Sequence, residues 1–125
     1  GRRPRARTAA APPCADGPLL SLGGPMPATE RLLVRYGLCI GDFDLFEVNE
    51  AFSVVPMRYA RHFDIDPQRI NANGGAIALG HPLGATGAIL AGALLDELER
   101  RGAGLGLVTL CAAAGQSTAM VIERV

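Results

Sequence analysis

A glycine-rich segment, residues 71–88 (NANGGAIALGHPLGATGA), limits the possible folds of this chain more than any other feature. Five of its eighteen residues are glycine, and one histidine, His81, lies among them. Glycine permits backbone conformations that other residues avoid and lets the main chain approach other groups closely. The segment follows a short extended pattern and precedes a helical one, so it predicts a structured loop between a strand and a helix.

The rest of the chain alternates helical and extended patterns. Asn49 is a favoured N-cap, and Pro56 predicts a kink in the helix that would follow. A long helix is expected to end near residue 101, because Glu97 and Arg101 can pair four residues apart on its surface and Gly102 is a natural C-cap. The expected elements, in order, are a helix within 23–38, a strand at 43–48, a helix at 49–63, a short strand within 69–75, a helix at 84–101, and strands at 105–111 and 118–125. This order predicts an α/β fold in which helices cover a mixed sheet.

Composition excludes several classes of protein. The chain has 125 residues, enough for one domain, and its 12 basic and 12 acidic residues cancel, so neither nucleic acid nor an anionic membrane is predicted as a partner. No uninterrupted apolar run reaches the roughly 18 residues that a membrane span needs. Three widely spaced cysteines and two histidines fit neither a disulfide framework nor a metal site. A reducing compartment, the cytoplasm, is therefore expected.

The first 18 residues (GRRPRARTAAAPPCADGP) are rich in Arg, Ala and Pro. Prolines oppose an amphipathic helix, and an apolar secretory core is missing. We therefore expect a low-complexity or disordered leader at 1–18, or the cut edge of a longer protein, followed by one domain at 19–125.

His81 is the leading candidate for a catalytic group. Pro82 restricts His81 to extended conformations and Gly80 allows close approach of the backbone, so the ring is aimed by a stiff main chain. The helix expected from Gly84 or Ala85 would direct its positive end toward a developing negative charge near the ring. The alternative is a structural histidine beside a helix start. A phosphate-binding loop is disfavoured, because His81 and Pro82 stand where that motif needs Lys and Ser or Thr.

Two further residues allow both a structural and a catalytic interpretation. Cys111 ends an apolar strand before a turn of small residues, and could be a buried small hydrophobe or an acid or base with a shifted pKa. Asn49 could cap a helix or hold a water in a site.

Three blocks of sequence together resemble the C-terminal half of the thiolases, the acetyl-CoA acetyltransferase and 3-ketoacyl-CoA thiolase group. They are NEAF (49–52), the glycine segment (71–88) and LCAAAGQSTAMVIER (110–124), and GGPMPAT (23–29) is similar to the turn that opens that half. The resemblance runs from about Asp16 to Val125. It implies a thiolase-like fold, a five-stranded mixed sheet layered with helices.

The resemblance also implies a chemistry, Claisen condensation or thiolysis of 3-ketoacyl-CoA thioesters through an acyl-cysteine, with coenzyme A as substrate and no cofactor or metal. His81 matches the histidine that activates the nucleophile, and Cys111 matches the cysteine that moves protons. Asn49 matches the asparagine whose bound water, together with the histidine, receives the thioester oxygen. Gly80, Pro82 and Gly84 are expected to contact substrate beside His81.

The resemblance places a second oxyanion site at a backbone amide that here belongs to Ala113. The family pattern is Cys-x-Gly-Gly-Gly, whereas this chain has Ala113 and Ala114 at two of the glycine positions. A replaced glycine that needs a positive φ would add about 1–2 kcal/mol of strain.

The family's nucleophilic cysteine belongs to an N-terminal half, and neither Cys14 nor Cys39 has its sequence context. The partners expected are therefore a CoA thioester, an N-terminal thiolase half and, in the complete protein, further copies of itself. Two alternatives stay open: a catalytically silent thiolase-like module that binds CoA esters or proteins, and a remnant unable to fold alone.

Overall fold

The computed structural model describes residues 1, 3–10, 13–17, 19 and 21–125. The strands in this part of the chain are β1 (Ala6–Ala10), β2 (Pro13–Ala15), β3 (Leu45–Val48), β4 (Leu105–Cys111) and β5 (Gln116–Arg124). The helices are α1 (Pro25–Tyr36), α2 (Val54–Phe63), α3 (Ala76–Leu79) and α4 (Thr86–Arg101), with 3-10 turns at Ile40–Asp42, Pro67–Arg69 and Ala113–Gly115.

The strands form one mixed sheet in which β5 has the most neighbours. β5 pairs antiparallel with β4 on one side and with β1 and β2 on the other, and β3 pairs parallel with β4. Val48 lies opposite Thr109 in the parallel pair. The five-stranded mixed sheet is confirmed, but the strand expected within 69–75 is only an isolated bridge between Phe46 and Ile70.

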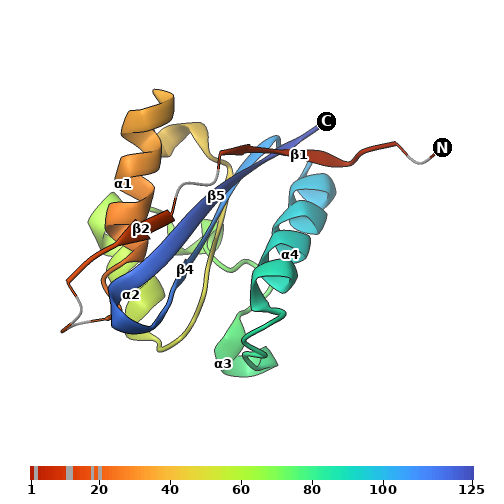
Figure 1. Cartoon of the computed structure of the whole chain (residues 1–125). Coiled ribbons are helices and arrows are strands. Elements are labelled where there is room, and N and C mark those ends of the chain that lie inside the picture. The colour runs from red at the N-terminus through yellow and green to blue at the C-terminus, as the bar shows by residue number, and fades with distance from the viewer. Residues whose placement is uncertain (2, 11–12, 18, 20) are drawn as a thin grey trace.

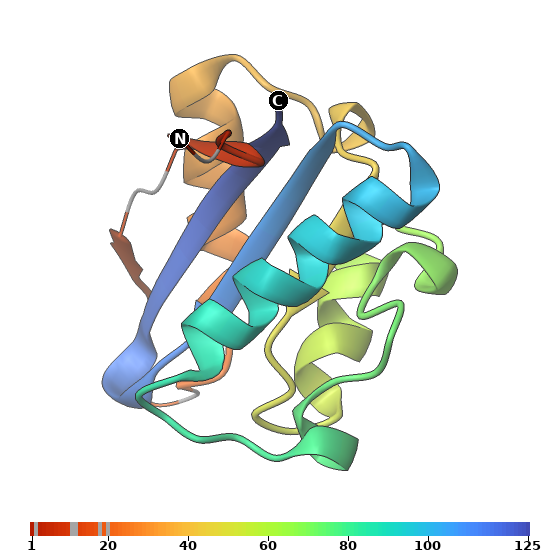
Figure 2. The same ribbon diagram turned by 90° about the vertical axis from the view of Figure 1, so that its right-hand side faces the viewer.

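Helices cover both faces of the sheet, with α1 and α2 on one face and α4 on the other (Figure 1). Side chains alternate across a strand, so each face has its own core. Phe46 and Leu107 belong to the cluster with α1 and α2, whereas Leu45 and Val108 belong to the cluster with α4. Figure 2 shows α4 crossing in front of β4.

The described residues of the segment 1–18 do not form the expected disordered leader but include two strands of the sheet. Residues 6–10 and 13–15 are strands paired with β5, and Cys14 is buried in the core; residues 2, 11, 12 and 18 lie outside the described part. The composition of residues 1–18 predicts disorder because it carries no information about distant partners. In the structure, the edge of β5 supplies backbone hydrogen-bond partners to the strands in this segment. The boundary predicted between residues 18 and 19 therefore does not separate disorder from the fold.

The helix predicted from Asn49 begins later, at Val54. Asn49 instead extends β3, because its backbone N–H donates to the carbonyl of Thr109 at 3.0 Å, so its prediction as an N-cap is wrong. Pro56 falls in the first turn of α2, where a missing N–H costs no helical hydrogen bond, and the predicted kink is also wrong.

α4 confirms the long helix. Leu90, Leu94 and Leu98 are buried against the sheet, while Ile89 is 47% exposed, so one face of α4 remains outside the core. The predicted pair is present, with Arg101 2.5 Å from the Glu97 carboxylate, and Gly102 ends the helix with a φ of 68°.

Candidate active site

The candidate site lies at the end of the sheet where β3 ends and α4 begins, and both views place the β4–β5 turn at the same end (Figures 1 and 2). Asn49 follows β3 directly and is 1% exposed. Leu45, Glu47 and Asn49 alternate with Phe46 and Val48, so Asn49 lies on the face that α4 covers. The sheet thus holds Asn49 rigidly beside the glycine segment.

His81 and Asn49, which the sequence placed together by resemblance, are brought together in space. Asn49 Nδ2 lies 3.5 Å from His81 Nε2, at the long end of hydrogen bonding. The backbone before the ring requires glycine, because Gly80 has a φ of 91°, a conformation that other residues rarely adopt. His81 itself is exposed to solvent, so the glycine before it and the contact with Asn49, rather than burial, define the position of its ring.

The other ring nitrogen of His81 contacts a residue that the sequence did not single out. His81 Nδ1 lies 2.6 Å from Thr86 Oγ1. Thr86 is 3% exposed at the first turn of α4, and its hydroxyl donates to the carbonyl of Pro82 at 3.0 Å. The same carbonyl accepts from the backbone amides of Ala85 and Thr86 at 2.8 and 2.9 Å. Pro82 therefore closes the turn that joins His81 to the helix.

A small cavity of about 30 Å³ lies between β3, the glycine segment and α4, and Glu47, Asn49, Gly80 and Thr86 contribute to its lining. Asn49 Oδ1 is buried and has no hydrogen-bond partner within the described part of the chain. A cavity of this size can hold a water molecule, and a buried carbonyl oxygen calls for a donor.

Glu47 is the most perturbed acid near the site. It is 2% exposed, and burial, with the nearby charges of Glu50 and Glu97, raises its pKa to about 8. Glu97 differs because Arg100, Asn73 and Arg101 hydrogen-bond to its carboxylate and lower its pKa to about 2. At neutral pH Glu47 beside the small cavity is therefore mostly protonated, whereas Glu97, near the other end of α4, is ionised.

Glu50 ties two of the motifs together. Its carboxylate accepts from Asn71 Nδ2 at 3.1 Å and from the backbone N–H of Ile77 at 3.0 Å. Asn71 also accepts from the Val48 amide at 2.8 Å, so the glycine segment is fastened to the end of β3.

Cys111 is at the same end of the sheet but on the other face. Its side chain packs against the cluster with α1 and α2, as that of Leu107 does, whereas Asn49 and His81 lie on the α4 side. Burial raises the pKa of the Cys111 thiol, so it stays protonated at neutral pH. The structure thus brings together two of the three predicted catalytic side chains.

The remaining predicted residues lie at exposed turns. Ala113 opens the 3-10 turn after Cys111, and Gly84 lies just before α4 with open space around the position of a Cβ. Ala114 has a φ of 59°, so one of the two alanines in place of glycine does adopt the strained conformation.

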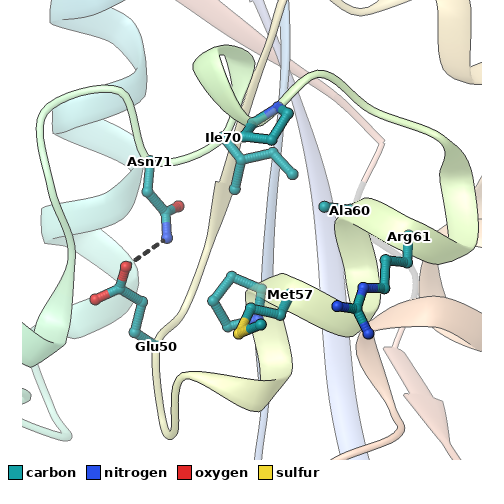
Figure 3. A pocket seen from close by; sticks show the side chains of 8 residues that line it. Glu50, Met57, Ala60, Arg61, Ile70 and Asn71 are labelled. Atoms are coloured by element: carbon teal, nitrogen blue, oxygen red, sulfur yellow. Dashed lines mark hydrogen bonds between the residues drawn. The ribbon is translucent and has the colours of Figure 1, made fainter.

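A larger cavity of about 370 Å³ lies between α2 and residues 67–71 (Figure 3). Its lining is mostly apolar, with Met57, Ala60 and Ile70 on its walls and the Glu50–Asn71 hydrogen bond at one side. His81 and Cys111 are not among its lining residues. His81 lines neither cavity, and the 30 Å³ cavity is the one lined by its two neighbours Asn49 and Thr86.

Thr86, Glu47 and Glu50 contribute to the site, although their sequence positions did not predict this. Thr86 lies five residues after His81, and Glu47 lies two residues before Asn49, on the same face of a strand. That alternation was the available signal for Glu47. No group of three potential metal ligands occurs among the described residues, and none of the helices there is both long and apolar enough to cross a bilayer.

Comparisons with known proteins point to one family. The family model described as "Thiolase, C-terminal domain" matches residues 3–124. The steroid 3-ketoacyl-CoA thiolase FadA6 of Mycobacterium tuberculosis is 49% identical over 124 residues, which cover 99% of this chain and 30% of that protein. The acetyl-CoA acetyltransferase of Escherichia coli is 48% identical over 107 residues, 86% of this chain and 27% of that protein.

A solved structure has the same fold. The crystal structure of the Bacillus anthracis acetyl-CoA acetyltransferase matches 98% of this chain with a TM-score of 0.94 and 35% identity. The match covers 31% of that chain, so this chain spans about 30% of the length of its relatives. The chain belongs to the thiolase family, and its fold is that of the thiolase C-terminal domain.

Proposed function

We propose that this chain is the C-terminal catalytic domain of a thiolase that acts on acyl-CoA and 3-ketoacyl-CoA thioesters. The observation that carries the proposal is the Asn49–His81 pair, fixed between β3 and α4 in a domain of this family. The names of the relatives, acetyl-CoA acetyltransferase and 3-ketoacyl-CoA thiolase, support this class of substrate.

In this proposal His81 Nε2 takes the proton of a nucleophilic cysteine that an N-terminal thiolase half supplies. With an acyl-CoA, the thiolate attacks the thioester carbonyl carbon and the C–S bond to coenzyme A breaks, releasing the CoA thiolate. With a 3-ketoacyl-CoA, the thiolate attacks the 3-keto carbon and the bond between the α and β carbons breaks, releasing acetyl-CoA as a carbanion that takes up a proton. Both routes leave an acyl-cysteine. Protonated Nε2 and a water held by Asn49 would then stabilise negative charge on a thioester oxygen, and such donors are commonly worth about 3 kcal/mol each. Ala113 would offer a backbone amide, and Gly80, Pro82 and Gly84 would line the approach of substrate.

Cys111 is the proposed proton donor to the substrate carbon or to the departing CoA sulfur. A protonated thiol, as burial favours here, suits that task. The chemistry needs reduced thiols, and all three cysteines are free, which fits a reducing compartment such as the cytoplasm. Coenzyme A enters as substrate, with no further cofactor, and the complete protein is proposed to form homo-oligomers.

One observation favours a second candidate, the catalytically silent module that binds CoA esters or a protein. Cys111 packs on the face of the sheet opposite His81, away from the position that proton transfer requires.

A chimera separates the two candidates. Residues 3–124 would replace the matching segment of the Escherichia coli acetyl-CoA acetyltransferase, and thiolysis of acetoacetyl-CoA by free CoA would be measured. We expect turnover that falls by about 10²–10⁴ in His81→Ala and Cys111→Ala. The matched control is His62→Ala, which changes the exposed histidine on α2. A folded chimera without turnover would favour the silent module, and turnover by the 125-residue chain alone would contradict the need for a second half.

A further inference from the structure

Thr86 contacts one ring nitrogen of His81, and counting hydrogens indicates which ring nitrogen carries the proton. A threonine hydroxyl has one hydrogen to donate and lone pairs to accept. The Thr86 hydroxyl donates its hydrogen to the Pro82 carbonyl at 3.0 Å. Since the carbonyl can only accept, both contacts of the hydroxyl are satisfied together when it accepts in its 2.6 Å contact with His81 Nδ1. In that arrangement Nδ1 carries the ring proton of neutral His81.

The opposite side of the ring agrees with this assignment. Asn49 Nδ2 is a donor, and at 3.5 Å from Nε2 it needs a lone pair on that nitrogen. The hydrogen bonds then run in one direction, from Asn49 to His81, from His81 to Thr86, and from Thr86 to Pro82. The reverse direction would put two donors, Nε2–H and Nδ2–H, against each other.

We infer that Thr86 is a positioning residue that holds neutral His81 in the Nδ1–H form, so that Nε2 is its basic nitrogen. The tautomer of a histidine is set by the hydrogen bond that its other nitrogen makes. Thr86 is well placed to do this, because it is buried and belongs to the first turn of α4, which packs on the sheet through Leu90 and Leu94. The tautomer follows from contacts within this chain, and only the use of Nε2 for thiol deprotonation rests on the proposed function.

The cavity beside Asn49 supports the same orientation of the Asn49 side-chain amide, with Nδ2 toward His81. With Nδ2 directed at His81, Oδ1 points to the buried side and has no partner within the described part of the chain. The 30 Å³ cavity lined by Glu47 and Asn49 has room for a water to donate to it. An amide turned the other way would present Oδ1 to Nε2 and would require Nε2–H.

Nitrogen NMR of the 125-residue chain with ¹⁵N-labelled histidine tests the inference without any enzymatic assay. The His81 signals would be assigned by their loss in His81→Gln, with His62 as the internal reference. We expect His81 to show a protonated Nδ1 and an unprotonated Nε2 above the pH at which the ring loses its charge. A wild-type His81 with the proton on Nε2 would overturn the inference, whether or not a complete enzyme is active.

Two variants connect the tautomer to Thr86 itself. Thr86→Val keeps the shape but removes the hydroxyl, and we expect a mixture of tautomers; Thr86→Ser keeps the hydroxyl and should retain Nδ1–H. Retention of the wild-type tautomer in folded Thr86→Val would refute the role of Thr86. Should Thr86→Val not fold, the wild-type spectrum and Thr86→Ser still decide, because either can show the proton on Nε2.

In the chimeric enzyme Thr86→Val should lower kcat more than it raises KM, and Thr86→Ser should restore kcat. A chimera that is inactive with wild-type Thr86 would count against the proposed function and leave the NMR result standing.

Discussion

The carboxylate of Glu50 accepts a hydrogen bond from the backbone N–H of Ile77, 27 positions later in the sequence, at 3.0 Å. This contact joins the NEAF segment to the first turn of α3. Gly75 lies beneath it, and a Cβ at that position would be 2.3 Å from Glu50 Cδ.

Gly75→Ala should therefore displace the Glu50 carboxylate and break its bonds to Asn71 and Ile77. Hydrogen bonds to charged groups contribute about 1.5–3 kcal/mol each, so we expect the loss of the two to lower the free energy of unfolding by about 3–6 kcal/mol. Urea denaturation measures it. Gly41→Ala is the matched control, since nothing lies within 4 Å of its Cβ position, and it should change stability by less than about 0.5 kcal/mol. Equal effects of the two substitutions would contradict the clamp.

The raised pKa of Glu47 predicts a pH-dependent stability. Between its ordinary value of 4.5 and about 8, Glu47 is protonated in the folded chain and ionised in the unfolded chain. The folded state then binds more protons, so stability falls as pH rises, by about 1.4 kcal/mol per pH unit from this group, and its contribution is fully present only below pH 4.5. Glu47→Gln should flatten the profile and be more stable than wild type at pH 9. Urea denaturation at several pH values from 5 to 9 gives the free energy of unfolding of the two proteins. If that free energy changed with pH in the same way in both, a buried neutral Glu47 would be ruled out.

Ala114 adopts a φ of 59°, a conformation that costs a residue with a Cβ about 1–2 kcal/mol. Ala114→Gly removes this strain but makes the unfolded chain more flexible, which costs about 0.4–1 kcal/mol. The strain is the larger quantity, so we expect a net gain of up to about 1 kcal/mol. Thermal unfolding by calorimetry measures the change. Ala112→Gly, where φ is −130°, should not stabilise the chain, and a gain there equal to that of Ala114→Gly would remove strain as the cause.

The three cysteines should react with iodoacetamide at different rates at pH 7.5. Cys39 is exposed and should be alkylated first. Cys111 should follow slowly, because burial raises the pKa of its thiol and only the thiolate is nucleophilic. Cys14, 7% exposed within β2, should react last. Peptide mass spectrometry over time gives the order, and rapid labelling of Cys14 would show that β2 does not stay paired with β5.

The parts of the fold that the sequence predicted well are those in which local pattern and packing agree. α4 combines leucines at helical spacing with a glycine stop, and β4 and β5 are apolar runs separated by a short turn. The leader was mistaken for disorder because its partner, β5, lies more than 100 residues away. Local propensity carries no information about a pairing at that distance.

The candidate site likewise contains residues that sequence motifs identify and residues that only tertiary contacts identify. The resemblance led to Asn49 and His81, which the structure places 3.5 Å apart. Thr86 and Glu47 were overlooked because neither residue type is distinctive, and each matters only through what it contacts. The side-chain direction of Cys111 depends on the alternation of β4 at its last residue, which a motif does not report.

The strand order has a consequence for how the chain is made. β1, β2 and β3 precede β4 and β5 in the sequence, yet apart from the single bridge between Phe46 and Ile70 their pairing within the described residues is with β4 or β5, which occupy residues 105–124. On the ribosome, where the N-terminal residues emerge first, those three strands have no sheet to join until residues 105–124 have left the exit tunnel. Until then their backbone groups are available to other extended chains, so the interval in which this domain is most exposed to misassembly is set by the speed of translation.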